Sequence, residues 1–153
     1  MRYGMQFAQI AVIITVMALA SVGARASDLD SNATALATLQ AKADQAPPRD
    51  RCYLYAELVG QLTDRVGQQF NSGDFGQASE SLVLLRRYAV QIDSAVTDDS
   101  RKLKDAEMLT RRASFRLSSM LRGASYEDRP ALDATLQLVY KAQKNLMMQV
   151  FKR

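Results

Sequence analysis

The sequence predicts an all-α fold, and three observations lead to this prediction. Apolar residues recur at spacings of three and four along most of the chain, which is typical of amphipathic helices. Residues that break helices are scarce, because the 153 residues include only three prolines and seven glycines. The patterns typical of strands are missing. We therefore expect an up-down antiparallel four-helix bundle with a short additional N-terminal helix.

Periodicity and helix-ending residues divide the chain into five helical segments. Pro47 and Pro48 separate the first two segments, because proline is tolerated only in the first turn of a helix. Gly73 and Gly123 end the second and the fourth, since glycine readily adopts the left-handed conformation that follows many helices. The predicted segments are residues 28–43, 48–70, 74–96, 99–122 and 127–151. The four longer segments would form the bundle.

The predicted core consists of one apolar stripe on each segment. The most regular stripe, on the third segment, is Phe75, Ala78, Leu82, Leu85, Ala89, Ile92 and Val96. A second apolar strip has two interpretations, a surface covered by the first helix or the seam of a homodimer. This strip is Leu54, Leu58, Leu84 and Tyr88.

The first 26 residues have the three parts of a secretory signal peptide. Arg2 supplies the positive charge, residues 10–20 form the apolar core, and Ala24-Arg25-Ala26 gives the small-x-small cleavage pattern. The apolar core is shorter than the roughly 20 residues that a spanning helix needs. We therefore predict cleavage after Ala26, a single helical domain over residues 27–153, no membrane span after cleavage, and a periplasmic or secreted location. An uncleaved N-terminal anchor is the alternative.

Charge and composition exclude several classes of function. The formal net charge of +4 falls to +2 when Arg2 and Arg25 leave with the signal peptide, so we expect no nucleic-acid partner. The chain has no histidine, which excludes Ser-His-Asp and Cys-His catalysis, a haem with a histidine ligand and the Glu-x-x-His pairs of di-iron bundles. Cys52 is the only cysteine, and we expect a small buried residue there rather than a reactive thiol. We predict no catalytic, cofactor-binding or metal-binding residues.

The fourth segment carries the clearest candidate binding surface. Its basic residues outnumber its acidic residues, and a turn of 100° per residue places several of them opposite the core stripe of that segment. The candidate partner-binding face is Lys104, Met108, Arg111, Arg112, Phe115 and Arg122. A basic face with an aromatic ring and a thioether suits an acidic protein or another polyanion. The alternative is an ordinary solvated face, with Phe115 covered by another segment.

The C-terminal segment ends in a methionine-rich stretch that includes Met147, Met148 and Phe151. Methionine-rich surfaces adapt to varied apolar partners. We expect instead that these three side chains close the end of the bundle.

Three stretches of the chain resemble uncharacterised small exported helical proteins of soil bacteria. These stretches are residues 52–59, residues 102–109 and residues 127–132 continuing through 147–153. The resemblance covers most of the chain after the signal peptide. It implies export and a helical domain, and it implies no activity and no site residues, because that group has no assigned function.

These observations favour an exported, non-enzymatic helical interaction protein that binds an acidic partner through the basic face. The first alternative is a periplasmic holdase-type chaperone, which would bind unfolded chains through exposed apolar side chains. A carboxylate-dependent hydrolase is the second alternative, and it would need a cleft where acidic side chains converge.

Overall fold

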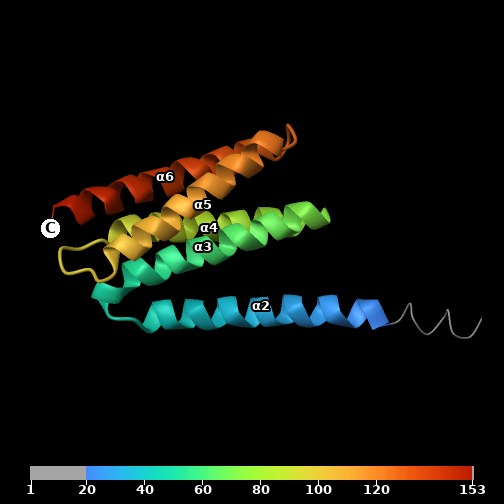
Figure 1. Ribbon diagram of the computed structural model, residues 1–153, viewed down its shortest axis with the longest axis horizontal. Coiled ribbons are helices and arrows are strands. Elements are labelled where there is room, and N and C mark those ends of the chain that lie inside the picture. Colours follow the sequence, from blue (N-terminus) through green and yellow to red (C-terminus); the bar gives the residue numbers. More distant parts are fainter. Residues whose placement is uncertain (1–19, 153) are drawn as a thin grey trace, which may run out of the picture. The chain divides into compact units, whose positions relative to one another are not determined.

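The computed structural model describes residues 20–152 and shows an all-helical protein (Figure 1). The helices in this range are α2 (Ala20–Gln45), α3 (Pro48–Ser72), α4 (Phe75–Ala95), α5 (Leu103–Gly123) and α6 (Arg129–Phe151). No strand occurs among these residues, so the predicted all-α class is confirmed. None of the described helices is both long enough and apolar enough to cross a membrane.

The chain divides into two compact units, residues 1–38 and residues 39–153. The described part of the first unit is the α2 stretch from Ala20 to Thr38. This helix begins earlier than the predicted residue 28 and has 26 residues, so it is longer than expected. No proline interrupts it, and alanines are frequent along it, which favours a continuous helix. Residues 1–19 of the predicted signal peptide lie outside the described residues.

The loop before α5 explains why this helix begins at Leu103 rather than near residue 99. The Thr97 N–H donates a hydrogen bond of 2.9 Å to the hydroxyl of Ser100, and the Ser100 N–H donates one of 3.1 Å to the Thr97 carbonyl. Side chains that bond to nearby backbone in this way compete with helix formation. The Arg101 N–H then donates a hydrogen bond of 2.8 Å to the carbonyl of Arg49. The loop is thereby attached to the start of α3.

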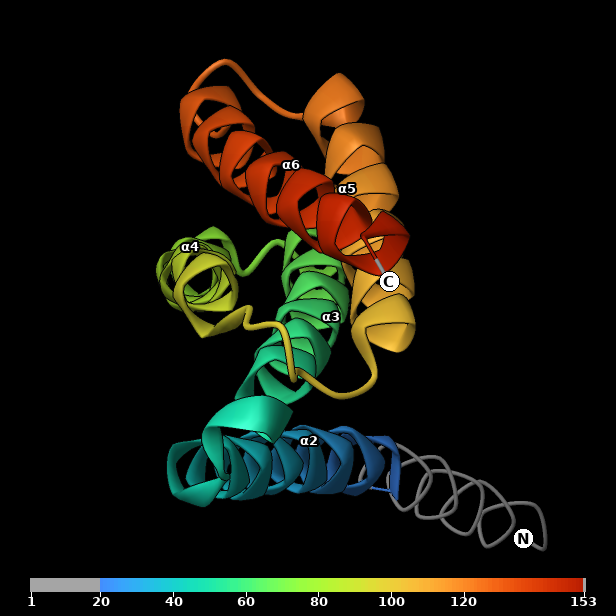
Figure 2. The same ribbon diagram turned by 90° about the vertical axis from the view of Figure 1, so that its left-hand side faces the viewer.

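Within the second unit, each of the helices α3 to α6 contacts two of the others. Helix α3 contacts α4 and α5, and α6 contacts the same two helices from another side. Figure 2 shows α4 and α5 on opposite sides of α3. No contact between α4 and α5 is present in the described part of the chain, although these helices are consecutive.

The contacting helices include antiparallel pairs and parallel pairs. Short turns join α3 to α4 and α5 to α6, and each of these pairs is antiparallel. Helices α3 and α5 run in the same direction, because Gly60 faces Leu109 and Gly67 faces Met120 further along both helices. Chain direction therefore alternates along the sequence as expected, but α4 and α5 are not neighbours in space.

Most of the predicted apolar stripes are buried. Helix α3 is covered on two sides, and Tyr55 on it stacks against Tyr88 of α4 with 5.9 Å between ring centroids. The largest fully buried apolar side chains are Leu58, Leu62, Leu82, Leu85, Ile92, Leu117, Leu132, Leu146, Val59, Val66 and Val139. Each buried leucine contributes about 1.5–3 kcal/mol by leaving water. Leu54, Leu58 and Tyr88 of the second apolar strip are also buried, whereas Leu84 is partly exposed.

Cys52 is completely buried, which confirms the expected small interior residue. Burial removes water from the thiol and raises the pKa of Cys52 to about 12. Because the thiolate is the nucleophilic form of cysteine, this side chain is unreactive at neutral pH.

Cys52 leads to a prediction about alkaline stability. The ordinary pKa of a thiol is 9.0 and that of folded Cys52 is about 12, so the unfolded chain loses the proton first as the pH rises. The contribution of Cys52 to stability is complete below pH 9 and is lost between pH 9 and pH 12, at about 1.4 kcal/mol per pH unit. In Cys52→Ala this loss is absent, so its free energy of unfolding should fall less steeply over the same range.

Urea denaturation of both proteins at a series of pH values measures the two slopes. A comparison at pH 7 gives the cost of the truncation itself, which is subtracted before the slopes are compared. Parallel slopes for the two proteins in the alkaline range would contradict the prediction.

Candidate functional site

Helix α5 has one buried face and one exposed face. The buried residues are Leu103, Ala106, Glu107, Thr110, Ala113, Ser114 and Leu117, and they lie on the side that contacts α3 and α6. The opposite side carries all six residues of the predicted binding face, and each of them is exposed. We call Lys104, Met108, Arg111, Arg112, Phe115 and Arg122 the α5 basic face.

Phe115 is the central apolar residue of the α5 basic face. Its exposed fraction is 71%, and that of Met108, two turns earlier, is 51%. No described segment covers Phe115, contrary to the alternative interpretation of this face. An aromatic ring held in water among cations is a strong anchor for a partner, because its burial releases a large apolar surface.

The cations of the α5 basic face differ in the partners that they already have. Arg111 forms a bidentate ion pair with Glu107, with an Nη2–Oε1 distance of 2.7 Å and an Nη2–Oε2 distance of 2.8 Å. Arg122 donates a hydrogen bond of 3.2 Å to the hydroxyl of Ser118. Lys104 and Arg112 make no hydrogen bond or ion pair with any side chain among residues 32–152, the range over which the structure describes side chains. These two cations are therefore the ones available to an acidic partner.

The buried position of Glu107 is a feature that the sequence analysis missed. Only 5% of Glu107 is exposed, so its carboxylate needs a charged partner to offset the loss of hydration. Arg111 supplies that partner from the next turn of the helix. Arg111 therefore stabilises the fold, although it lies on the α5 basic face.

A groove of about 720 Å³ lies beside Phe115, where α3 and α5 end and α6 begins. The apolar side chains that line it are Phe70, Phe75, Phe115, Met120 and Leu132. Phe75 was predicted to be a core residue, but it is 52% exposed and packs on Phe70 with 5.9 Å between ring centroids. Arg116 pairs with Asp64 at the same groove, which joins α5 to α3. The groove extends the apolar part of the α5 basic face.

The C-terminal methionines do not close the end of the fold as expected. The exposed fractions of Met147, Met148 and Phe151 are 41%, 46% and 82%. Tyr140 on the same helix is 44% exposed. The expectation that the methionines and Phe151 are buried is wrong, and these side chains form a second exposed apolar group on α6.

The described residues contain no cluster of three or more cysteine and carboxylate side chains that could hold a metal ion. Comparisons with protein-family models, with curated proteins and with solved structures found no match to this chain.

The two adjacent arginines of α5 lead to a paired prediction. Arg111→Gln leaves the carboxylate of Glu107 buried without its cation, so we expect the free energy of unfolding to fall by about 1–3 kcal/mol. Arg112→Gln removes a cation without a partner and should change stability by less than about 0.5 kcal/mol. Urea denaturation at neutral pH measures both values. Equal losses in the two variants would show that the Glu107–Arg111 pair has no special role in stability.

Proposed function

We propose that this chain is an exported, non-enzymatic interaction protein built on a four-helix bundle of α3, α4, α5 and α6. The bundle is supported by the contacts of each helix with two others and by the buried stripe that each one contributes. In this arrangement the two antiparallel hairpins, α3–α4 and α5–α6, pack against each other. The signal-peptide pattern of residues 1–26 supports a periplasmic or secreted location.

The proposed activity is binding of an acidic protein segment through the α5 basic face. The observation that carries this proposal is the 71% exposure of Phe115 next to the unpaired cations of Lys104 and Arg112. Cations on the rim speed the encounter with an acidic partner and select it by charge. The aromatic ring and the groove beside it then supply affinity by burying an apolar side chain of the partner.

The proposal predicts different effects for charge reversal and for loss of the ring. With a fluorescent peptide of glutamates interrupted by leucines, Lys104→Glu combined with Arg112→Glu should weaken binding by about tenfold or more. The binding of the unaltered protein should weaken as salt is added, and that of the double variant should respond much less. Phe115→Ala should also weaken binding by roughly tenfold, but with an unchanged dependence on salt. Fluorescence anisotropy at several salt concentrations measures the affinity of the unaltered protein, of the double variant and of Phe115→Ala.

A matched control separates the α5 basic face from a general charge effect. Arg129→Glu combined with Lys144→Glu makes the same change in net charge at exposed positions of α6. This control should bind the acidic peptide with at most a small loss of affinity. If it loses as much affinity as the α5 variant, or if a peptide of lysines and leucines binds equally well, the proposed surface is wrong.

A second candidate function is a holdase-type chaperone, which the exposed apolar group on α6 favours. Such proteins bind unfolded chains through adaptable apolar side chains, and Met147, Met148 and Phe151 are of this kind. Under this function, replacement of these three residues by serine should abolish most of the suppression of aggregation of a heat-unfolded enzyme at equimolar ratio. Light scattering measures the aggregation.

The control for the chaperone experiment lies on α4. Val83 and Val90 are 55% and 53% exposed, and they are separate from the α6 group. Val83→Ser combined with Val90→Ser should leave the suppression of aggregation unchanged. If the unaltered protein does not suppress aggregation at all, the chaperone function is excluded.

A further inference from the structure

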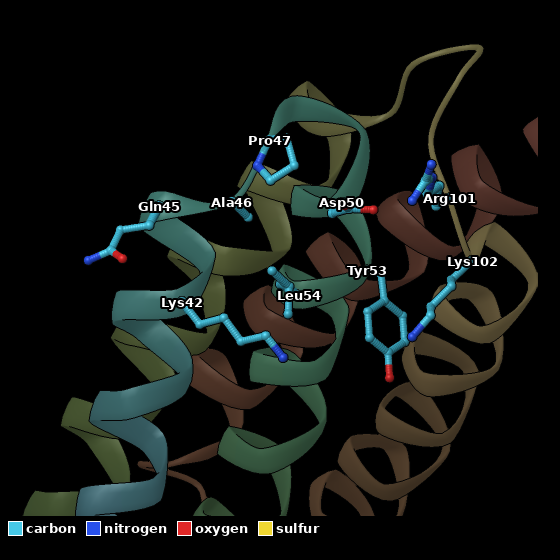
Figure 3. Close-up of a pocket in the computed structure, with 9 residues that line it drawn as sticks. All are labelled: Lys42, Gln45, Ala46, Pro47, Asp50, Tyr53, Leu54, Arg101 and Lys102. Carbon is cyan, nitrogen blue, oxygen red and sulfur yellow. The ribbon is translucent and has the colours of Figure 1, made fainter.

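A pocket of about 480 Å³ lies in the second unit, where the last turn of α2, the start of α3 and the loop before α5 come together (Figure 3). Two groups of side chains in its lining matter for binding. Tyr53 and Leu54 of α3 supply an aromatic and an aliphatic surface. Lys42, Arg101 and Lys102 supply three cations. A cavity of this size accommodates a small organic molecule.

The pocket has three cations and one carboxylate in its lining, so it carries an excess of positive charge. Asp50 is the carboxylate among the lining residues, and its Oδ2 atom lies 4.0 Å from Nε of Arg49, which is not part of the lining. Among the side chains of residues 32–152, no carboxylate forms an ion pair with Lys42, Arg101 or Lys102. Like charges gathered around one cavity repel each other, and a bound anion would relieve that repulsion.

One of these cations lies over the aromatic ring of the pocket. The Nζ atom of Lys102 lies 4.5 Å from the centroid of the Tyr53 ring. In Figure 3 the side chains of Lys42 and Lys102 extend toward Tyr53 and Leu54 from opposite sides of the pocket. The Tyr53 hydroxyl makes no hydrogen bond within the part of the chain that the structure describes, so it remains free to donate one.

The backbone holds Lys102 in this position at a conformational cost. Lys102 has φ 53° and ψ 33°, and it is the one residue other than glycine with a positive φ among residues 20–152. Side chains with a Cβ atom rarely adopt this left-handed conformation. The hydrogen bond from the Arg101 N–H to the Arg49 carbonyl fixes the preceding residue, so Lys102 is presented at the mouth of the pocket.

We propose that this pocket binds a small organic anion. The anionic group, a carboxylate or a phosphate, would lie among Lys42, Arg101 and Lys102, and the apolar body would pack on Tyr53 and Leu54. This site is separate from the α5 basic face and uses none of its residues. It gives the protein a small-molecule ligand in addition to an acidic protein partner.

The proposal is tested by titrating the purified full chain with three aromatic probes of similar shape. Phenyl phosphate and benzoate carry the two anionic groups, and benzylammonium carries the opposite charge. In heteronuclear NMR spectra, we expect at least one of the anions to give saturable shifts of the backbone amides near Tyr53 and Lys102, and the tighter anion identifies the preferred group. Benzylammonium should give no such shifts, and inorganic phosphate should bind more weakly than phenyl phosphate because it lacks the apolar body.

Two substitutions test whether the lysines of the pocket bind the anion. Lys42→Gln and Lys102→Asn should each weaken binding of the preferred anion by roughly tenfold, the usual loss when a charged hydrogen-bond donor is removed. Asparagine tolerates the left-handed conformation, so Lys102→Asn removes the charge without displacing the loop. Lys144→Gln on α6 is the matched control and should bind normally. Circular dichroism checks that each variant is folded, and Lys42→Gln tests the pocket independently of the loop.

Three results would overturn the proposal. The first is the absence of saturable shifts with both aromatic anions. The second is binding of benzylammonium as tight as that of the aromatic anions, which would show that the pocket does not recognise negative charge. Binding of inorganic phosphate as tight as that of phenyl phosphate would likewise show that it does not recognise the apolar body. The third is unchanged affinity in folded Lys42→Gln and Lys102→Asn.

Discussion

The fold depends on burial of α3 from two sides. Leu58, Leu62 and Val66 on this helix are completely buried, and α4 and α5 cover it from opposite directions. Since α5 has its apolar side against α3 and α6, its remaining side is directed to solvent. The charged and aromatic residues of the α5 basic face are therefore displayed because the core occupies the other side of the same helix. The exposed α5 basic face and the core are two consequences of one amphipathic pattern.

Periodicity predicted the helices well because it reports which side of each helix leaves water. Helices α3, α4 and α6 begin and end within about two residues of their predicted positions, which is the usual uncertainty of helix ends. The same pattern does not report which neighbour covers a buried stripe. For this reason the sequence could not reveal that α4 and α5 are separated in space. It also placed the start of α5 too early, because Asp98 and Asp99 resemble a helix start but belong to the loop that Thr97 and Ser100 close.

The candidate sites also include features that the sequence could predict and features that it could not. The exposure of Phe115 follows from helical spacing, because the residue lies opposite the core stripe. Phe75 was assigned to the core because it begins the regular stripe of the third segment, and Phe151 because it lies at the end of the bundle. Both are exposed, since spacing does not report whether a neighbour reaches the end of a stripe, and apolar side chains contribute much of any protein surface. The pocket at the start of α3 could not be predicted from the sequence, since Lys42, Tyr53 and Lys102 are distant in sequence. The left-handed backbone of Lys102 could not be predicted either, because no glycine marks it.

The pairing of helices also has a consequence for the order of folding. Helices α3 and α4 are joined by a short turn at Gly73, and α5 and α6 by a short connection after Gly123, so both hairpins form through contacts close in sequence. Closing such short loops costs little chain entropy, and proteins rich in local contacts fold quickly. The contacts of α3 with α5 and of α4 with α6 join residues that are further apart in sequence, so forming them closes longer loops. A chain interrupted between residues 95 and 103 during synthesis would therefore contain both helices of the first hairpin, but the sides of α3 and α4 that pack on α5 and α6 would be uncovered.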